Sequence, residues 1–479
     1  MKTIVLTILL CFLSVQISQA QWQPDVRLTN DPALSSTSGY DNANCIVSTG
    51  DTVHVVWRDN RDGGNYEIYY KRSTDGGLNW GSDTRLSNNI YFSTDPSLSV
   101  SGSLVFVVWS DNRDGNYEIY FNHSTNGGTS WGTDTRLTND SAESANPSVS
   151  VSGSVVNVLW GDNRGGGIKT GSYCKRSTDG GISWGADTFL RIAWGPSVAA
   201  AGSAVHVVYN DSAKVSYIRS TDGGLNWGAS THLTFDSVIT NNPSVSVSGS
   251  NVHVLWLDSR NNLKYEIYYK HSLDGGITWG ADTRLTINYT SATLHAAVST
   301  SGSFVHVVWD DNRDGNYEIY YKRSTDGGLS WGTDTRLTNN SGQSVYPFVS
   351  ASGSAVHVLW QDNRDGGNYE IYYKRNPTGN VTGIENIGSE LPEEFNLEQN
   401  YPNPFNPNTV ISYSLPSASN VKLIVYNTLG QIVKTLESGY KNTGNYSVNF
   451  NASNLPSGIY FYKLEAGQFS QIKKMLLLK

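Results

Sequence analysis

Cysteine is nearly absent from this chain of 479 residues, which contains only three. Cys11 falls within the first 20 residues, so Cys45 and Cys174 are left for the body of the protein. We expect no disulfide between them, because they lie in different repeats and at different strand positions of the pattern described below. The scarcity of cysteine excludes a small scaffold held together by disulfides.

Long apolar runs are also missing. The run Ile4–Val15 is mostly apolar but too short to span a membrane, and no later run is long enough. Lys2 precedes this run and the small-x-small sequence Ser18-Gln19-Ala20 follows it, which is the pattern of a secretory signal peptide. We therefore predict a signal peptide at residues 1–20. The mature protein would be secreted or held at the outer-membrane surface after export to the periplasm. An exported protein of this length without disulfides is more typical of bacteria than of animals.

An excess of basic residues is absent as well. The net charge is −8 and charges of both signs are interspersed, so the sequence predicts neither a nucleic-acid partner nor binding to an anionic membrane. Only two methionines stand against 14 tryptophans, 28 tyrosines and 47 glycines. Because aromatic residues favour strands and glycine favours tight turns, this composition predicts short strands rather than helices.

Six variants of Ser-x-Asp-Gly-Gly-x-x-Trp recur about every fifty residues, which indicates a repeated small sheet. The glycines supply the positive φ of a tight turn, and the acidic side chain accepts N–H groups of that turn. The tryptophan is worth burying between repeats. Asn126 replaces the aspartate in one copy, which suits a structural acceptor and not a catalytic acid. The predicted structural residues are Asp75, Asn126, Asp179, Asp222, Asp274, Asp326, Trp80, Trp131, Trp184, Trp227, Trp279 and Trp331.

Each repeat contains four segments with the pattern of strands, for example 146–153, 53–57, 66–73 and 83–87. Four antiparallel strands per repeat predict one blade of a β-propeller. The aromatic residue that ends the second segment occurs seven times, at Trp57, Trp109, Trp160, Tyr209, Trp256, Trp309 and Trp360.

The last repeat stops after its third segment, at Arg375, and the missing fourth segment is present at the other end of the chain as Asp25–Thr29. Pairing of the two would close the ring and remove an exposed edge. We therefore predict an all-β, seven-bladed β-propeller of four-stranded blades over residues 21–375, closed by the N-terminal strand. A six-bladed propeller is the alternative if one weak repeat is irregular.

The motif of Ser73–Trp80 and its five relatives resemble the Asp-box, or BNR, repeats of sialidase-like β-propellers. The preceding sequence, Trp-x-Asp-Asn-Arg-Asp-Gly and then Ile-Tyr-Tyr-Lys-Arg-Ser, resembles a variety common in secreted bacterial proteins. The resemblance covers residues 21–375. It implies that the Asp boxes lie on the face away from the substrate site, so they predict architecture and not activity.

The repeat ends at Arg375, and residues 376–397 have the composition of a linker. Residues 398–479 contain alternating segments that predict a small immunoglobulin-like β-sandwich, at Val410–Leu415, Val421–Tyr426, Tyr446–Phe450 and Ile459–Leu464. The sequence Tyr-Pro-Asn-Pro-Phe-Asn-Pro from Tyr401 and the ending Lys-Lys-Met-Leu-Leu-Leu-Lys resemble the type IX secretion sorting domain of Bacteroidetes-like bacteria. That resemblance implies type IX secretion machinery as a partner, and removal of this domain after export.

Sialidase chemistry would need three convergent arginines, a Tyr–Glu nucleophile pair and an acidic residue. Here nearly all arginines recur in register, so pairing with Asp or Glu of the same loop is the simpler interpretation, and the repeated Tyr–Glu pairs are structural by the same argument. The family's Phe/Tyr-Arg-Ile-Pro signature is absent before the first Asp box, and Phe189–Ala193 is only a faint echo. The repeated arginines are Arg61, Arg113, Arg164, Arg260, Arg313, Arg364, Arg27, Arg85, Arg136, Arg284 and Arg336.

Metal binding has two candidate patterns. One position of the second segment carries a repeated histidine, but equivalent residues of sheets about 10 Å apart cannot share a metal. The acidic Asp-Asn-Arg-Asp-Gly loops would suit calcium, although their spacing is not that of a known calcium loop and their arginine would repel a cation. We predict no cofactor, with calcium as the alternative. The histidines are His54, His206, His253, His306 and His357.

The repeat is broken in its third and fourth copies, at 165–169 and at Tyr209–Lys214. The short connection between them contains Trp194, which with Trp22 lies outside the repeated tryptophan positions. Both changes fall at the end opposite the Asp boxes, where a groove with an aromatic face would suit a glycan. The alternative is decay of the repeat, with Trp194 filling a gap. The predicted ligand-binding residues are Trp194, Arg191, Tyr209, Asp211 and Lys169.

Three functions remain open from the sequence. The first is a secreted or surface propeller that binds or scaffolds without catalysis, with a glycan or surface polysaccharide as ligand. The second is a glycoside hydrolase of exo-sialidase type with its site opposite the Asp boxes; paired carboxylates would favour a hydrolase and three unrepeated arginines a sialidase. The third is a purely structural surface protein.

Overall fold

The computed structural model describes residues 22–39, 43–164, 171–192, 194–211, 214–234, 240–260, 265–287, 293–379, 395–400, 403–441 and 444–478. The predicted signal peptide lies outside these residues. Every regular element in the described residues is a β-strand, which confirms the all-β prediction. None of them forms a helix long and apolar enough to cross a membrane. The chain divides into two compact units, Met1–Val381 and Thr382–Lys479.

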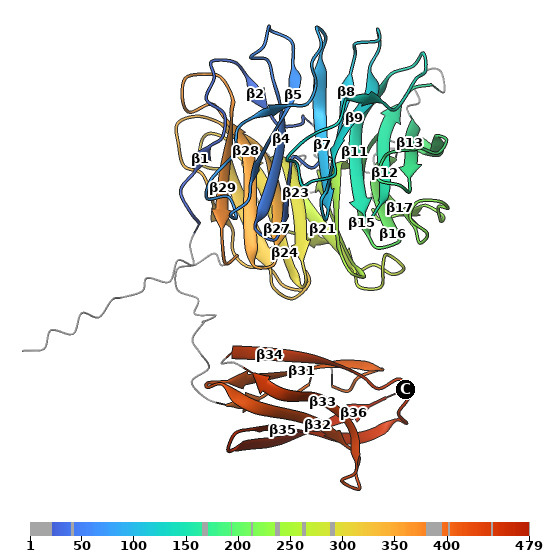
Figure 1. The fold of residues 1–479 in the computed structure, drawn as a ribbon, viewed down its shortest axis with the longest axis vertical. Helices are drawn as coiled ribbons and strands as arrows, with labels where there is room; N and C mark the ends of the chain where they lie inside the picture. Colours follow the sequence, from blue (N-terminus) through green and yellow to red (C-terminus); the bar gives the residue numbers. More distant parts are fainter. Residues whose placement is uncertain are drawn as a thin grey trace, which may run out of the picture. The chain divides into compact units, whose positions relative to one another are not determined.

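In the described part of the first unit the strands form seven antiparallel sheets, numbered here first to seventh in chain order (Figure 1). One cavity of about 270 Å³ is lined by the inner strands of all seven sheets, so these strands face a common axis. The inner strands are β3 (Ile46–Thr49), β7 (Ser93–Ser101), β11 (Ser144–Ser152), β15 (Trp194–Ala201), β19 (Thr240–Ser248), β23 (Thr293–Ser301) and β27 (Ser344–Ser352).

The remaining strands follow outward from this axis in each sheet. The second strands are β4 (Thr52–Asp59), β8 (Leu104–Asp111), β12 (Val155–Asp162), β16 (Ala204–Asp211), β20 (Asn251–Asp258), β24 (Phe304–Asp311) and β28 (Ala355–Asp362). The third strands are β5 (Glu67–Ser73), β9 (Glu118–Ser124), β13 (Gly171–Ser177), β17 (Lys214–Ser220), β21 (Glu266–Ser272), β25 (Glu318–Ser324) and β29 (Glu370–Asn376). The fourth strands are β6 (Thr84–Arg85), β10 (Thr135–Arg136), β14 (Thr188–Ile192), β18 (Thr231–His232), β22 (Thr283–Arg284) and β26 (Thr335–Arg336).

The second strands form the core because both of their faces are covered by neighbouring sheets. Val53, Val55 and Trp57 of β4 are fully buried, and the equivalent Val-x-Val-x-Trp residues of other sheets are buried in the same way. Such continuous apolar runs are typical of strands buried on both faces. The indole of Trp57 donates a hydrogen bond to Asp59 at 3.1 Å, so the polar atom of this buried ring is satisfied.

The seventh sheet takes its fourth strand from the N-terminus, as the sequence predicts. In β1 (Val26–Arg27), Val26 lies opposite Tyr373 of β29 in antiparallel register. Asp25 forms ion pairs with Arg364 at 2.7 Å and with Lys374 at 2.9 Å. Asp83 of the first sheet pairs with Arg61 and Lys71 in the same way. The inner strands contact one another in chain order, and β27 contacts β3. We interpret this arrangement as a ring of seven blades.

The structure corrects the prediction that Trp22 lies outside the repeated tryptophan positions. Its ring packs edge-on against Tyr321 of the preceding sheet, with centroids 5.0 Å apart. Trp80 packs in the same way against Tyr373 at 4.9 Å. The spacing Trp-x-x-Asp-x-Arg-Leu is the same at Trp22 and at Trp80. Trp22 is therefore the tryptophan of the seventh repeat, carried at the other end of the chain.

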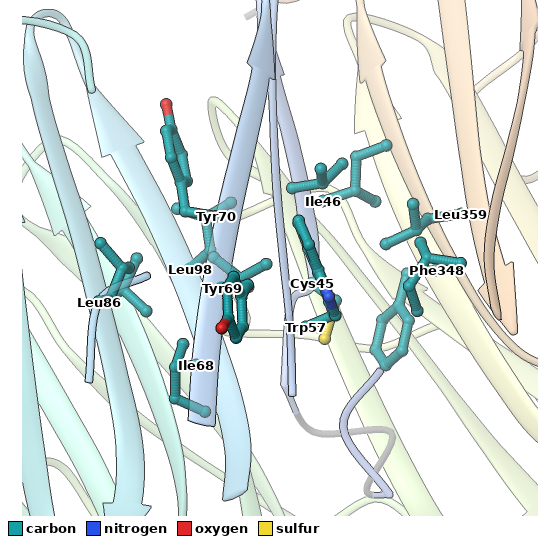
Figure 2. Close-up of a cluster of buried hydrophobic side chains, with 14 of the residues drawn as sticks. Cys45, Ile46, Trp57, Ile68, Tyr69, Tyr70, Leu86, Leu98, Phe348 and Leu359 are labelled. Atoms are coloured by element: carbon teal, nitrogen blue, oxygen red, sulfur yellow. The ribbon is translucent and has the colours of Figure 1, made fainter. Parts of the chain in front are cut away.

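Side chains from the two ends of the propeller sequence share one core cluster (Figure 2). Phe348 and Leu359 of the seventh sheet lie beside Cys45 and Trp57 of the first. Cys45 is buried and unpaired, as is Cys174, so both act as small apolar residues. Burial raises the pKa of the Cys45 thiol to about 12, which keeps it neutral.

The first sheet departs from the others at its inner strand. β2 (Ser35–Ser36) pairs with the end of β4, and β3 pairs with its beginning. In the second sheet one strand, β7, makes both pairings, with only Asp95 and Pro96 between the two registers. In the first sheet residues 37–44 stand at that place. The first repeat thus carries an insertion at the end of the sheet that lies away from the Asp boxes.

The second unit is a sandwich of two sheets over one core, which contains Tyr413, Leu423 and Tyr462. The sequence identifies four of its seven strands. It misses the two-residue β30, and also β33 and β36, whose exposed faces are polar or mixed. The strands are β30 (Asn396–Leu397), β31 (Asn408–Leu415), β32 (Ser419–Tyr426), β33 (Ile432–Lys441), β34 (Gly444–Asn451), β35 (Gly458–Ala466) and β36 (Phe469–Leu477).

Candidate functional site

The Asp boxes are self-contained turns. The carboxylate of Asp75 accepts hydrogen bonds from the backbone N–H of Asn79 at 2.9 Å and of Leu78 at 3.1 Å, and from the hydroxyl of Ser73 at 2.7 Å. Hydrogen bonds from Asn79 and Ser73 hold the pKa of Asp75 below its ordinary value. In the second copy the amide oxygen of Asn126 accepts from the two equivalent N–H groups. A neutral amide thus suffices as the acceptor in this turn, and the structural role of these residues stays a prediction.

The repeated arginines are held by carboxylates. Arg61 forms ion pairs with Asp59, with Asp83 at 2.6 Å and with Asp31 at 3.0 Å. Arg85 pairs with Asp62 and with Glu67, the glutamate of a repeated Tyr–Glu pair. Equivalent pairs recur around the unit, so these arginines and glutamates stabilise the fold. The Arg61 guanidinium already binds the carboxylate oxygens that a calcium ion would need. Calcium at these loops stays an untested alternative.

The repeated histidines bond within their own sheets. In each case Nδ1 lies 2.6–2.7 Å from the hydroxyl of a tyrosine in the third strand. Burial, and then the charge of a nearby arginine, lowers the pKa of His54 to about 4, so its ring is neutral at pH 7. These contacts give the histidines a structural role, as we infer from the sequence. The pairs are His54–Tyr70, His206–Tyr217, His253–Tyr269, His306–Tyr321 and His357–Tyr373.

The groove predicted in the third and fourth repeats is only partly described. Lys169 and the side chain of Trp194 lie outside the described residues. Arg191 donates to the carbonyl of Leu190 at 2.8 Å and also lies near Tyr209. Tyr209 is 1% exposed and its hydroxyl lies 2.6 Å from that of Ser230, so its ring is enclosed like the equivalent tryptophans.

Asp211 ends β16 and lies opposite Lys214. The described residues thus bring Arg191, Tyr209 and Asp211 together. Ligand binding by the predicted group of five stays a prediction.

A different position breaks the symmetry more completely. The residue directly after the second-strand aromatic differs in all seven sheets: Arg58, Ser110, Gly161, Asn210, Leu257, Asp310 and Gln361. This residue lies near the end of the second strand, whereas the Asp box contacts its beginning, where Gly76 donates to the carbonyl of Asp51. The variable position therefore lies at the end of the propeller opposite the Asp boxes.

A cavity of about 560 Å³ opens beside this position between the first three sheets. Arg58 of β4, Asp95 of β7 and Ser110 of β8 line it, together with Tyr117 and Glu143 from the loops at the same end. The inserted segment of the first repeat contributes Gly39, whose N–H lies 3.4 Å from the Asp95 carboxylate. Arg58 and Ser110 stand at the variable position and differ from the residues of the other sheets. Tyr117 and Asp95 instead occupy positions that recur in several repeats.

Arg58 differs from the repeated arginines in having no anionic partner. Among the described residues the Arg58 side chain makes no ion pair and no hydrogen bond. Its Nε is buried without a partner, as is that of the repeated arginines Arg61 and Arg164, but their terminal nitrogens are held by carboxylates. The Arg58 guanidinium lies over the ring of Tyr66, 4.9 Å from the centroid, which offsets part of the cost of burial. A buried donor without a partner costs free energy. What sets Arg58 apart is that its terminal nitrogens have no carboxylate partner among the described residues, so they are available to a ligand in the cavity.

Two exposed aromatic side chains lie in the connection that precedes a strand of this cavity, although neither of them lines it. Tyr91 is 46% exposed and Phe92 is 42% exposed, in the connection that leads into β7. Phe92 packs near Tyr66, with ring centroids 6.1 Å apart, and Tyr66 in turn carries Arg58. Asp95 has a positive φ of 52°, and the equivalent residues Asn146 and Asn242 have 56° and 52°, so this conformation belongs to the bend of the inner strand in several sheets.

A second unrepeated cluster lies in the sixth and seventh sheets. Asp310, whose side chain is fully buried, accepts the backbone N–H groups of Leu294, His295 and Tyr346 at 3.0–3.2 Å. His295 Nδ1 lies 2.7 Å from the same carboxylate, and its ring stacks on Tyr346 with centroids 3.7 Å apart. Tyr346 has a φ of 53°. This cluster is a fully bonded polar network rather than an open site.

The sequence reasoning missed Arg58, Asp95, Tyr117, Glu143 and the pair Tyr91–Phe92. The sequence does contain a signal for Arg58. When the repeats are aligned, the residue after the second-strand aromatic differs in every repeat. The apolar sequence Ile90-Tyr91-Phe92 also replaces the polar connections of most other repeats. The shortened third and fourth repeats point instead to the neighbouring part of the ring.

Comparison with known proteins places the C-terminal unit in a family. Residues 399–478 match the model described as a secretion system C-terminal sorting domain. Among curated protein sequences, none matches this chain.

Solved structures resemble the chain in fold. Polysaccharide lyase Uly1 has a TM-score of 0.51 and 9% sequence identity, covering 75% of this chain and 100% of that one. A protein of unknown function from Dyadobacter fermentans gives 0.47 and 14%, covering 75% and 99%. Trypanosoma rangeli sialidase in complex with 2,3-difluorosialic acid gives 0.45 and 12%, covering 95% and 89%. At these identities the likeness concerns the fold alone. The chain therefore consists of an all-β unit of propeller type followed by a C-terminal sorting domain of the secretion-system family.

Proposed function

We propose that this is an exported surface protein whose propeller binds glycans without converting them, at the cavity between its first three sheets. The observation that carries the proposal is Arg58, a guanidinium in the cavity that has no hydrogen-bond or ion-pair partner among the described residues. Exposed aromatic rings in the connection to β7 lie beyond Tyr66, over which Arg58 is held. Sugars present an apolar C–H face and many hydroxyls, which an aromatic platform beside charged groups matches. The ion pairs of the repeated arginines support binding over sialidase chemistry, which needs convergent free arginines.

Export is the part of this function that the sorting domain supports directly. The C-terminal family match is consistent with export through the type IX secretion system. We propose in addition that residues 1–20 are removed on entry to the periplasm and that the sorting domain is removed at the outer membrane. Mass spectrometry of the secreted protein tests both cleavages. A secreted chain that still contains residues 399–478 would contradict the second.

A glycoside hydrolase is the second candidate. Asp95 and Glu143 line the same cavity, and a pair of carboxylates is the usual machinery of glycosidic hydrolysis. Turnover of any fluorogenic glycoside that is lost in both Asp95→Asn and Glu143→Gln would favour the hydrolase. Binding without turnover across the panel would favour the first proposal.

The test of the main proposal is a glycan-array screen of residues 21–479. Phe92→Ala should weaken binding at least about tenfold, because stacking on an aromatic ring is a main source of sugar affinity. Leu225→Ala is the matched control, since Leu225 is exposed at an Asp box. Loss of binding in Trp194→Ala, with Phe92→Ala unchanged, would instead place the ligand in the groove predicted from the sequence. A screen without any bound glycan would overturn the proposal and favour a structural role.

A further inference from the structure

We infer that the cavity of the first three sheets selects uncharged, hydroxyl-rich sugars and rejects acidic ones. This inference rests on the proposed glycan-binding function and names the class of ligand for that site. It also separates this protein from sialidase-type recognition, in which arginines bind a carboxylate.

The charges around the cavity are the first part of the argument. Among the described residues two carboxylates, of Asp95 and Glu143, line it, against the one guanidinium of Arg58. Their negative charge affects Tyr117. Burial raises the pKa of its phenol, and the charges of the two carboxylates raise this pKa further. Arg58 opposes them with a smaller effect. A ligand carboxylate would therefore enter a region of net negative charge, where like charges repel.

The separation of these charges is the second part. Arg58 lines the same cavity as two carboxylates but pairs with neither within 4.0 Å. By contrast, Arg61, three residues away in the chain, contacts three carboxylates. The cavity thus holds a donor and acceptors apart, with open volume between them.

Neighbouring sugar hydroxyls fit such an arrangement. A hydroxyl accepts a hydrogen bond from a guanidinium and at the same time donates one to a carboxylate. A ligand carboxylate accepts only, so it would satisfy Arg58 and leave Asp95 and Glu143 facing a like charge. An uncharged diol satisfies all three groups, and these charge-assisted hydrogen bonds are stronger than neutral ones.

The exposed rings fix the orientation of such a ligand. With its apolar face on Phe92 or Tyr91, a sugar ring presents its equatorial hydroxyls at its edge, toward charged groups beside the platform. Arg58 is held over Tyr66, which itself packs near Phe92. The donor and the platform therefore belong to one packed group of side chains, so their relative position is set before the ligand binds.

The experiment compares matched neutral and acidic glycans on residues 21–479. The probes are asialo and sialylated N-glycans, galactan and polygalacturonate, and xylan and glucuronoxylan. We expect the neutral member of a bound pair to bind about tenfold more tightly than the acidic member, and added salt to reduce that ratio. Glu143→Gln should also reduce the ratio, whereas Asp51→Asn, which removes an equal charge at the Asp-box end, should leave it unchanged. Arg58→Gln should weaken the neutral member.

The outcomes separate the two proposals. Preferential binding of acidic members that Arg58→Gln abolishes would overturn this inference and leave glycan binding intact. Equal binding of both members would also overturn it. Absence of binding to every probe would overturn the proposed function, and with it this inference. A neutral preference that both Glu143→Gln and added salt reduce would support it.

Discussion

The two ends of the propeller are built from the same strands but differ in how strictly they repeat. At the Asp-box end the turns repeat closely, and Asn126 accepts the same two backbone N–H groups as Asp75 does. Only the side-chain bond reverses, because Asn126 donates to Ser130 where Asp75 accepts from Asn79. At the opposite end, the residue after the second-strand aromatic is different in every sheet. Residues that every repeat needs for folding recur in each repeat. Residues at the variable end are not constrained in this way, so they can differ from sheet to sheet.

The comparison also explains why one arginine stands apart. Repeated arginines such as Arg61 carry their carboxylates with them, in the same loop or in the next strand. Arg58 occupies a position where no other sheet has a cation. The repeat therefore provides no carboxylate to pair with it, and none among the described residues does so. A donor that the fold does not need is a candidate for recognition.

The largest expected effect comes from breaking the regular end. Gly77 has a φ of +83°, and an added Cβ would overlap the phenol oxygen of Tyr373. Gly77→Ala should cost about 3 kcal/mol or more of unfolding free energy through strain and overlap together. Gly50→Ala is the control, since Gly50 also has a positive φ but has open space around its Cβ. Its cost should be about 1 kcal/mol. Denaturant unfolding measures both, and equal costs would contradict the packing argument.

The variable end contains one network on which stability should depend. Asp310→Ala would leave three backbone N–H groups and His295 without their acceptor, which should cost about 3 kcal/mol. Ser110→Ala removes the acceptor of one N–H group, that of Asn146, and should cost about 1 kcal/mol. Thermal unfolding measures the loss of stability in both variants. The comparison is matched because Ser110 and Asp310 occupy the same position in two sheets. A smaller loss for Asp310→Ala than for Ser110→Ala would show that the network is not structural.

Trp22 tests whether the N-terminal segment completes the seventh repeat. Trp22→Ala should cost about 2 kcal/mol, as Trp80→Ala should, because both rings are partly buried against a tyrosine of the neighbouring sheet. Matched denaturant curves measure the two costs side by side. A near-zero cost for Trp22→Ala, with a clear cost for Trp80→Ala, would contradict the assignment of Trp22 to the repeat.

The histidines predict how stability depends on pH. The pKa of His253 is lowered to about 4 by burial, and then by the charge of His271. The unfolded chain therefore binds protons that the folded chain does not between pH 6.5 and 4. The stabilisation is complete above pH 6.5 and is lost as the pH falls through this window. The melting temperature should decrease accordingly.

The second sheet provides the matched variant for this effect. It has Phe106 where five other sheets have histidine, and this ring stacks on Phe121 with centroids 5.0 Å apart. The double substitution His253→Phe and Tyr269→Phe copies that pair and should make the decrease between pH 6.5 and 4 less steep. An unchanged slope would show that His253 does not remain neutral in the folded protein.

The fold could be predicted from the sequence because its signals repeat. The period of the Asp box, the seven second-strand aromatics and the displaced segment Asp25–Thr29 each indicate the sheets that the structure contains. Trp22 was assigned wrongly because its motif lacks the Ser-x-Asp-Gly-Gly turn that precedes the other tryptophans.

The candidate site could not be predicted in the same way. Its cavity depends on residues from three repeats, such as Arg58, Asp95 and Glu143, which are brought together only by the packing of sheets. The absence of a partner for Arg58 is likewise a property of the folded structure. The sequence shows that Arg58 is unusual in its column, but not that it faces a cavity.

The central claim is that the variable end, and not the Asp-box end, binds the ligand. Hydrogen–deuterium exchange of residues 21–479, with and without the tightest glycan of the array, measures this directly. We expect slower exchange at the connection of Tyr91 and Phe92, at the start of β7 and at Glu143, with the Asp-box turns unchanged. Protection confined to the Asp-box turns would contradict the account.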